Sequence, residues 1–185
     1  GRGSVRFYKG GATGPTLVWM VEGGPNARLS DPFSLGDLNG DGKPDLIIAN
    51  SATNFNIYRN VSLDSGSLSF VLATTLSVGS ATFKEVTVAD FDNDGRLDFA
   101  MSDYNNKAVQ VFRNITALNS STFSFSGPQT LPITGNTYGL TSGDLDGDGR
   151  ADIIISNVDS GPAGISIFRN LSVSATLSFA SRQDI

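Results

Sequence analysis

The sequence predicts an all-β protein built from β-propeller blades of four antiparallel strands. The sequence repeats at a period of 53–54 residues, from Asp37 to Asp90 to Asp144. Each unit holds four short segments rich in Val, Ile, Phe and Tyr, bounded by Gly, Asn, Asp and Ser. No window carries a helical apolar pattern over ten or more residues. Four strands in a repeat of about 50 residues match one propeller blade.

The four strands of each unit are expected in a fixed order around an aspartate-rich loop. The first strand is FSLG, VTVA or LTSG, and the loop that follows it leads into LIIA, FAMS or IIIS. These continuously apolar second segments predict a strand that is buried on both faces. The third strand is NIYRN, VQVFRN or ISIFRN, and the fourth lies in residues 67–76, 122–131 or 176–185.

The beginning of the sequence resembles only the second half of a unit. SVRFYKG matches the third strand and TLVWMVEG the fourth, so we expect about three and a half blades in one propeller region, residues 1–185. The expected divisions are a half blade at 1–30 and blades at 31–83, 84–137 and 138–185. Propellers close with about four to eight blades. A closed ring would therefore need either the remainder of a longer propeller chain or further copies in a homo-oligomer, because open sheet edges invite pairing.

Composition excludes several functions. The chain has 185 residues, a net charge of −5, and neither histidine nor cysteine. Zinc sites built from His or Cys, and Ser-His or Cys-His catalytic pairs, are therefore excluded, and we predict that the protein is not an enzyme. A pI near 4.5 without a basic stripe disfavours nucleic-acid binding. No apolar run approaches the roughly 18 residues of a membrane span, and residues 1–20 lack a signal-peptide pattern.

The aspartate-rich loops carry the chemistry. Of 16 aspartates, 11 lie in three loops that place oxygen-bearing side chains at positions 1, 3, 5 and 9 and glycine at position 6. Calcium prefers six to eight hard oxygen ligands, and the glycine permits the turn. Position 7 is cationic, so we expect it to contribute its carbonyl oxygen while its side chain points outward. The candidate ligands, about one ion per loop, are Asp37, Asn39, Asp41, Lys43 and Asp45; Asp90, Asp92, Asp94, Arg96 and Asp98; Asp144, Asp146, Asp148, Arg150 and Asp152.

Three other interpretations of the loops fit the sequence less well. Metal-free Asx turns explain one or two aspartates in a loop, but not three or four carboxylates that repel one another. Magnesium fits less well because it keeps its waters. A catalytic pair of carboxylates is disfavoured because the loops occur three times, whereas catalytic sites are usually single.

A partner would meet the other end of the blades. In an antiparallel meander, alternate connections lie at opposite ends, so the loops opposite the metal loops are free to vary on a fixed scaffold. Arg28, Lys84, Tyr104 and Tyr138 are the candidate ligand-binding side chains there. Ordinary surface variation is the alternative explanation.

The loops DLNGDGKPDLII, DFDNDGRLDFAM and DLDGDGRADIII resemble FG-GAP repeats, also described as VCBS-type repeats, which include the propeller of integrin α subunits. The resemblance implies a propeller of about seven blades, calcium between the first two strands of certain blades, an extracellular or cell-surface setting, and a role in adhesion or ligand recognition. The calcium ligands carry over by position, with Asn39 in place of an aspartate. The chain departs from the family in having three and a half repeats. Two alternatives stay open: a carbohydrate-binding lectin, and an accessory domain of a polysaccharide-degrading enzyme.

Overall fold

The computed structural model describes residues 4–10, 12, 14–22, 33–51, 53–63, 67–79, 82–158 and 164–185. Within these ranges the chain forms β-strands, turns and loops, and no helix. The strands are β1 (Ser4–Lys9), β2 (Thr16–Glu22), β3 (Phe33–Gly36), β4 (Asp45–Ala49), β5 (Asn54–Asn60), β6 (Phe70–Ser77), β7 (Phe83–Ala89), β8 (Asp98–Asp103), β9 (Ala108–Phe112), β10 (Gln129–Pro132), β11 (Asn136–Gly143), β12 (Asp152–Val158), β13 (Gly164–Phe168) and β14 (Gln183–Asp184).

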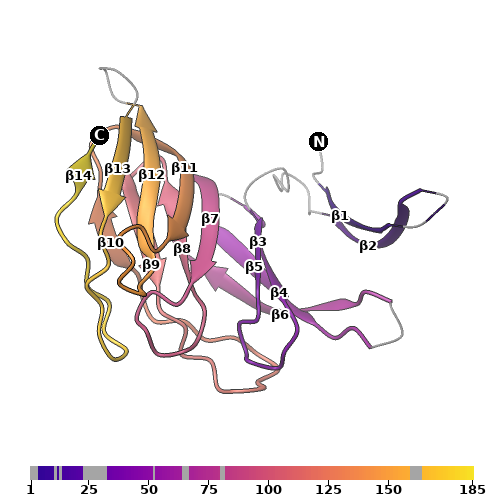
Figure 1. The fold of residues 1–185 in the computed structure, drawn as a ribbon. Helices are drawn as coiled ribbons and strands as arrows, with labels where there is room; N and C mark the ends of the chain where they lie inside the picture. The colour runs from indigo at the N-terminus through magenta and orange to yellow at the C-terminus, as the bar shows by residue number, and fades with distance from the viewer. Residues whose placement is uncertain are drawn as a thin grey trace.

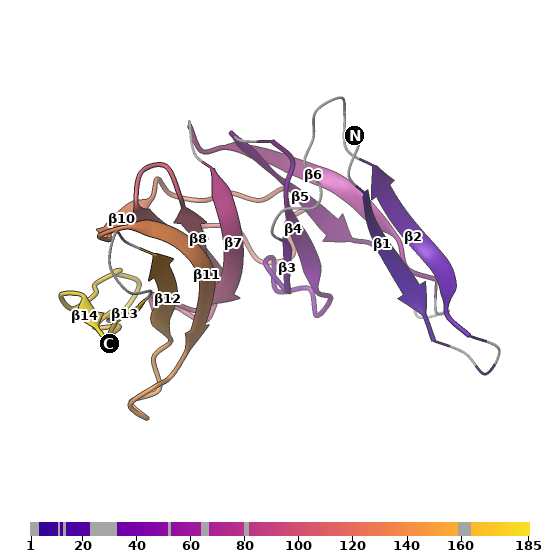
Figure 2. The ribbon, with the colours of Figure 1, turned by 90° about the horizontal axis from the view of Figure 1, so that it is seen from above.

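The strands form one two-stranded and three four-stranded sheets, in which sequential strands pair antiparallel. The orders are β1-β2, β3-β4-β5-β6, β7-β8-β9-β10 and β11-β12-β13-β14. The predicted all-β fold class and its four-stranded units are thereby confirmed. Figure 1 shows the sheets standing side by side, and Figure 2 shows them fanned out from above. The first strands β3, β7 and β11 are neighbours, as expected for the inner strands of blades.

The second strand of a blade is buried from both sides because alternate side chains face different neighbours. In β4, Ile47 packs towards the second blade in one apolar cluster, while Leu46 and Ile48 pack towards β1 and β2 in another. In β8, Phe99 faces the first blade and Ala100 the third. The continuous apolar run of these strands therefore reflects two separate interfaces.

The opening two strands are held by aromatic side chains. Trp19 lies 4.8 Å from Phe70, 5.4 Å from Phe7 and 5.8 Å from Tyr58 between ring centroids. Val5 is buried in the same cluster. The first blade is therefore covered on this side by β1 and β2.

The far side of the third blade is open in this structure. Ile165 is 44% exposed, whereas its repeat equivalents Val109 and Phe55 are 0% exposed. Ile154 is half-buried, and its equivalent Ala100 is fully buried. The same positions thus form an interface in two blades and an accessible apolar face in the third.

We expect Phe99→Ala to lower the free energy of unfolding by about 3–5 kcal/mol, because it opens a cavity between the first two blades. Phe99 is 0% exposed and stacks on Phe112 at 4.6 Å between centroids. Chemical denaturation followed by Trp19 fluorescence measures the change. The matched control is Phe33→Ala, at a side chain that is 55% exposed, and equal losses in both variants would contradict this account of the core.

Candidate metal loops and the opposite face

The three aspartate loops adopt the same hydrogen-bonded turn. The side chain at position 1 accepts from the backbone N–H groups of positions 5 and 6; for Asp90 the distances are 3.1 Å to Asp94 N and 2.8 Å to Gly95 N. Asp37 and Asp144 repeat these bonds within 0.1 Å. Glycine at position 6 has a φ of +84°, +87° and +85° in the three loops, a left-handed conformation that other residues rarely adopt.

Position 9 ties each loop to its own blade. Asp98 is fully buried; its Oδ2 accepts from Phe91 N at 2.9 Å and its Oδ1 from Asn114 N, on the segment after β9, at 2.7 Å. Asp45 and Asp152 make the equivalent bonds. The loop pattern predicts only a calcium-ligating role for this aspartate, and the structure gives it a second role in anchoring the loop.

The asparagine of the recurring Arg-Asn pair links one blade to the loop of the blade before it. Asn114 donates from Nδ2 to Leu38 O and to Leu97 O, both at 2.8 Å. Asn170 makes the equivalent bonds to Phe91 O and Ala151 O, both at 2.9 Å. Both side chains are buried, so these amides serve packing between blades.

Carboxylates converge in two of the loops. Asp90, Asp92 and Asp94 offer oxygens within 4.8 Å of one another, and so do Asp144, Asp146 and Asp152. Such all-oxygen groups fit a hard cation such as calcium. In the described first loop no such group of three acidic side chains forms, because the neutral Asn39 occupies position 3.

Arginines from the third strand contact the same carboxylates. Arg113, which follows β9, pairs through Nε with Asp92 and through Nη2 with Asp94 Oδ2 at 3.1 Å. Arg169 pairs in the same way with Asp146 and, at 3.3 Å, with Asp148. The hydrogen bond that Arg113 donates to Asp92, together with the charge of Asp92, raises the pKa of Arg113 despite burial, and the bond and charge of Asp146 likewise raise the pKa of Arg169. The segments NIYRN, VQVFRN and ISIFRN carry this arginine in every unit, but the sequence alone does not identify its partners.

In the first loop, an asparagine in place of an aspartate lowers the repulsion between carboxylates. Asn39 donates from Nδ2 to Asp41 Oδ2 at 3.2 Å and to Ser120 O at 2.8 Å. Its amide thus gives the Asp41 carboxylate a hydrogen-bond donor where the other loops use an arginine. The equivalent arginine, Arg59, has a buried Nε that makes no hydrogen bond within the part of the chain that the structure describes. Replacement of aspartate by asparagine at position 3 therefore removes the partner that the other two blades provide.

The expectation that the position 7 side chains all point outward is wrong for two loops. Arg96 and Arg150 turn back and pair with the position 5 carboxylates of Asp94 and Asp148. Lys43 instead donates to Ser62 O at 2.7 Å, away from the carboxylates. The longer, forked guanidinium reaches a carboxylate two residues away that the lysine of the first loop does not contact.

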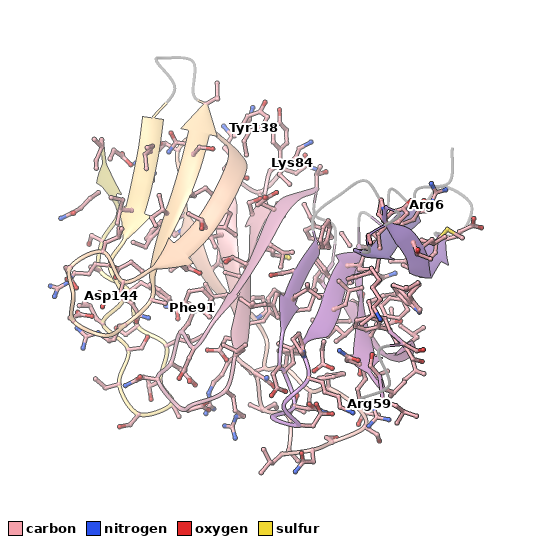
Figure 3. The ribbon with its side chains drawn as sticks, turned by 45° about the vertical axis from the view of Figure 1, so that its right-hand side comes forward. Arg6, Arg59, Lys84, Phe91, Tyr138 and Asp144 are labelled. Atoms are coloured by element: carbon pink, nitrogen blue, oxygen red, sulfur yellow. The ribbon has the colours of Figure 1, made fainter. Side chains whose placement is uncertain are left out.

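At the other end of the blades, three of the four candidate ligand-binding side chains lie together. Lys84 Nζ is 5.2 Å from the ring centroid of Tyr104, and the rings of Tyr104 and Tyr138 meet edge to face at 5.5 Å. Figure 3 shows Lys84 and Tyr138 at the end of the sheets opposite Asp144. Arg28 lies outside the described residues. Asn136 joins the group through a 3.1 Å bond from Nδ2 to the Tyr104 hydroxyl, and no repeat pattern marked it in the sequence.

We expect Arg113→Met to lower the free energy of unfolding in chelator by about 2 kcal/mol, because it leaves the buried Asp92 carboxylate without its counter-charge. Arg59→Met is the matched control, since the Nε of Arg59 has no hydrogen-bond partner among the residues that the structure describes. Urea denaturation measures both variants. An equal effect at the two positions would show that the arginine acts by packing and not by charge.

Metal-free protein should lose stability as the pH rises from about 4 to 7. Burial raises the pKa of Asp45 to about 6 and of Asp98 to about 7, although amide hydrogen bonds oppose the shift. The unfolded carboxyl titrates near 3.9, so between these values the folded state holds the extra proton and deprotonation costs stability. Urea denaturation in calcium-free buffer at several pH values, with a second series at higher salt as the control for surface charge, measures the slope. A free energy of unfolding that increases between about pH 4 and pH 7 would contradict this prediction.

None of the described residues form a helix that could span a bilayer.

The FG-GAP-like repeat model matches residues 37–101 and 99–155, which include all three aspartate loops. Cartilage acidic protein 1 of Homo sapiens is 28% identical over 163 residues, covering 81% of this chain and 24% of that protein. The Mus musculus protein of the same name is also 28% identical over 163 residues, with 81% and 25% covered. The chain thus spans about a quarter of the length of these curated relatives, and it belongs to the FG-GAP-like repeat family.

Proposed function

We propose that the chain is a calcium-stabilised recognition module of a secreted or cell-surface protein, acting in adhesion or ligand binding. The observation that supports calcium best is the convergence of three carboxylates in each of two equivalent loops. The backbone N–H bonds fix the orientation of these carboxylates before an ion arrives, and the oxygen donors are those that calcium selects. Repetition of one loop in successive blades favours a structural ion over a catalytic one.

Calcium in this setting would join carboxylates that the chain already holds close together. In loops two and three, arginines already contact the carboxylates at positions 3 and 5. Calcium would neutralise the negative charge that these arginines leave uncompensated. In loop one, Asp37, Asp41 and Asp45 with the Asn39 oxygen form a less acidic set. We therefore infer that the three sites differ in affinity, with the first the weakest.

A metal-independent scaffold is the second candidate, because the arginines already supply counter-charge in two loops. Arg113 and Arg96 both contact Asp94, so two cations serve the second loop without an ion. If this balance is sufficient, calcium adds little. The two candidates differ in what chelation does to the protein.

The recognition part of the proposal is based on the end of the blades opposite the metal loops. Lys84, Tyr104 and Tyr138 are brought together there by strands and turns from two blades. A glycan or a protein ligand are the two classes of partner, which keeps the lectin alternative open. The secreted setting is consistent with calcium sites that depend on the high calcium concentration outside cells.

Calcium should raise the free energy of unfolding by about 2.7 kcal/mol for each occupied site at a hundredfold excess over its dissociation constant. Calorimetric titration gives the number of ions, and thermal unfolding in calcium and in chelator gives the stability. Combined replacement Asp90→Asn and Asp144→Asn should remove two strong binding events. Asp184→Asn, on β14, is the control, and melting curves that coincide with and without calcium would favour the metal-independent scaffold.

A further inference from the structure

One of the positions that differ in chemistry between the repeats lies near the start of each unit. Six residues before the first aspartate of each loop, the sequence has Asp31, Lys84 and Tyr138. The last two stand near the starts of β7 and β11, which are adjacent inner strands. A fixed backbone position with a different side chain in each blade is what a recognition surface requires, since packing roles recur from blade to blade.

Tyr104 joins these two positions into one group. It follows β8 directly, and its backbone N–H donates to Thr82 O at 2.9 Å, which holds the turn against the start of β7. Its ring lies beneath the Lys84 ammonium group and edge to face with Tyr138, and its hydroxyl accepts from Asn136. Residues from three strand ends therefore form a preformed patch.

The patch is rich in hydrogen-bond donors. Lys84 is exposed, and no carboxylate of the described residues lies within 4.0 Å of its ammonium group. Asp103, next to Tyr104 in sequence, accepts from Asn106 Nδ2 at 2.8 Å, and Glu85, next to Lys84 in sequence, lines a different hollow with Gly139 and Leu140. Because the Tyr104 hydroxyl already accepts from Asn136, its own proton is available to another acceptor. A side-chain hydrogen bond with Tyr104 raises the pKa of Tyr138, so the two phenols already share one hydrogen bond. The Lys84 ammonium group and the one remaining phenol proton are therefore the donors that an outside oxygen acceptor can meet.

We propose that Lys84, Tyr104 and Tyr138 bind a carboxylate-bearing sugar, such as a uronic acid residue of a polysaccharide. Lys84 meets the sugar carboxylate, and the tyrosine hydroxyls with Asn136 meet its ring hydroxyls. Tyr138 is 44% exposed, and its ring offers a flat surface to the C–H face of the sugar. This inference is based on the recognition role proposed above and names the ligand class for it. A peptide carboxylate would meet Lys84, but it brings neither a C–H face for the Tyr138 ring nor ring hydroxyls for the Tyr104 hydroxyl.

The test uses an oligosaccharide of six sugars in which glucuronate and N-acetylglucosamine alternate. Its partner probe has each carboxylate reduced to an alcohol, so that the sugar rings stay and the charge goes. Calorimetry with the full chain in calcium should show binding of the acidic probe and at least about tenfold weaker binding of the reduced one.

Two variants separate the roles of charge and ring. Lys84→Met should weaken the acidic probe about tenfold and remove the preference over the reduced probe. Tyr138→Ala should weaken both probes alike. The controls carry the same changes on the first two strands, at the exposed Lys9 and Tyr8, and should bind as the unchanged protein does.

The proposal is overturned if neither probe binds at millimolar concentration, if Lys84→Met leaves the preference intact, or if an aspartate-containing peptide binds at Lys84 in place of the sugar. Its failure differs from failure of the calcium proposal. Loss of sugar binding with intact calcium titration refutes the sugar site alone, while absent calcium binding with sugar binding at Lys84 refutes the metal alone.

Discussion

The buried carboxylate at position 9 of each loop is the constraint on which the rest of the blade depends. Asp45, Asp98 and Asp152 accept hydrogen bonds from the loop backbone on one oxygen and from the third-strand asparagine backbone on the other. These bonds fix where strand one ends, where strand two begins and where strand three passes. The asparagine side chain then reaches the preceding blade. One buried carboxyl group therefore sets the shape of a blade, and in the second and third blades the asparagine bonded to it makes the join to the preceding blade.

The remaining carboxylates pose a charge problem, and the blades solve it in two ways. The second and third blades place a guanidinium across positions 3 and 5, whereas the first has Asn39 in place of an aspartate, and the Nε of Arg59 makes no hydrogen bond to the described residues. Both arrangements lower the repulsion among acidic groups that share a small volume. The two arrangements also leave a different net negative charge in the loop. Loops with nearly identical sequences can therefore differ in their affinity for a cation.

Much of the fold follows from the sequence because the blade is a local structure. One repeat of about 50 residues contains all that determines the alternation of strands and turns, the apolar second strand and the glycine turn. The arginine contacts were not foreseen, because Arg113 reaches Asp92 and Asp94 from a strand about 20 residues downstream, and register decides whether it does. The inward turn of Arg96 and Arg150 is a side-chain choice that the loop pattern leaves open. The grouping of Lys84 with Tyr104 and Tyr138 needed the packing of two blades, although topology placed all three at one end.

The open apolar face of the third blade affects how the molecule unfolds. A row of blades that touch only their neighbours behaves as a one-dimensional chain of coupled units, each stabilised by the interfaces it shares. The second blade has an interface on both sides, while in the third Ile165 is exposed and Ile154 is only half-buried. Opening should therefore spread inwards from β14, and the amide hydrogens of β12 and β13 should exchange with solvent sooner than those of β8 and β9. A partner that covered this face would give the third blade a second interface and slow its local opening, as in the second blade.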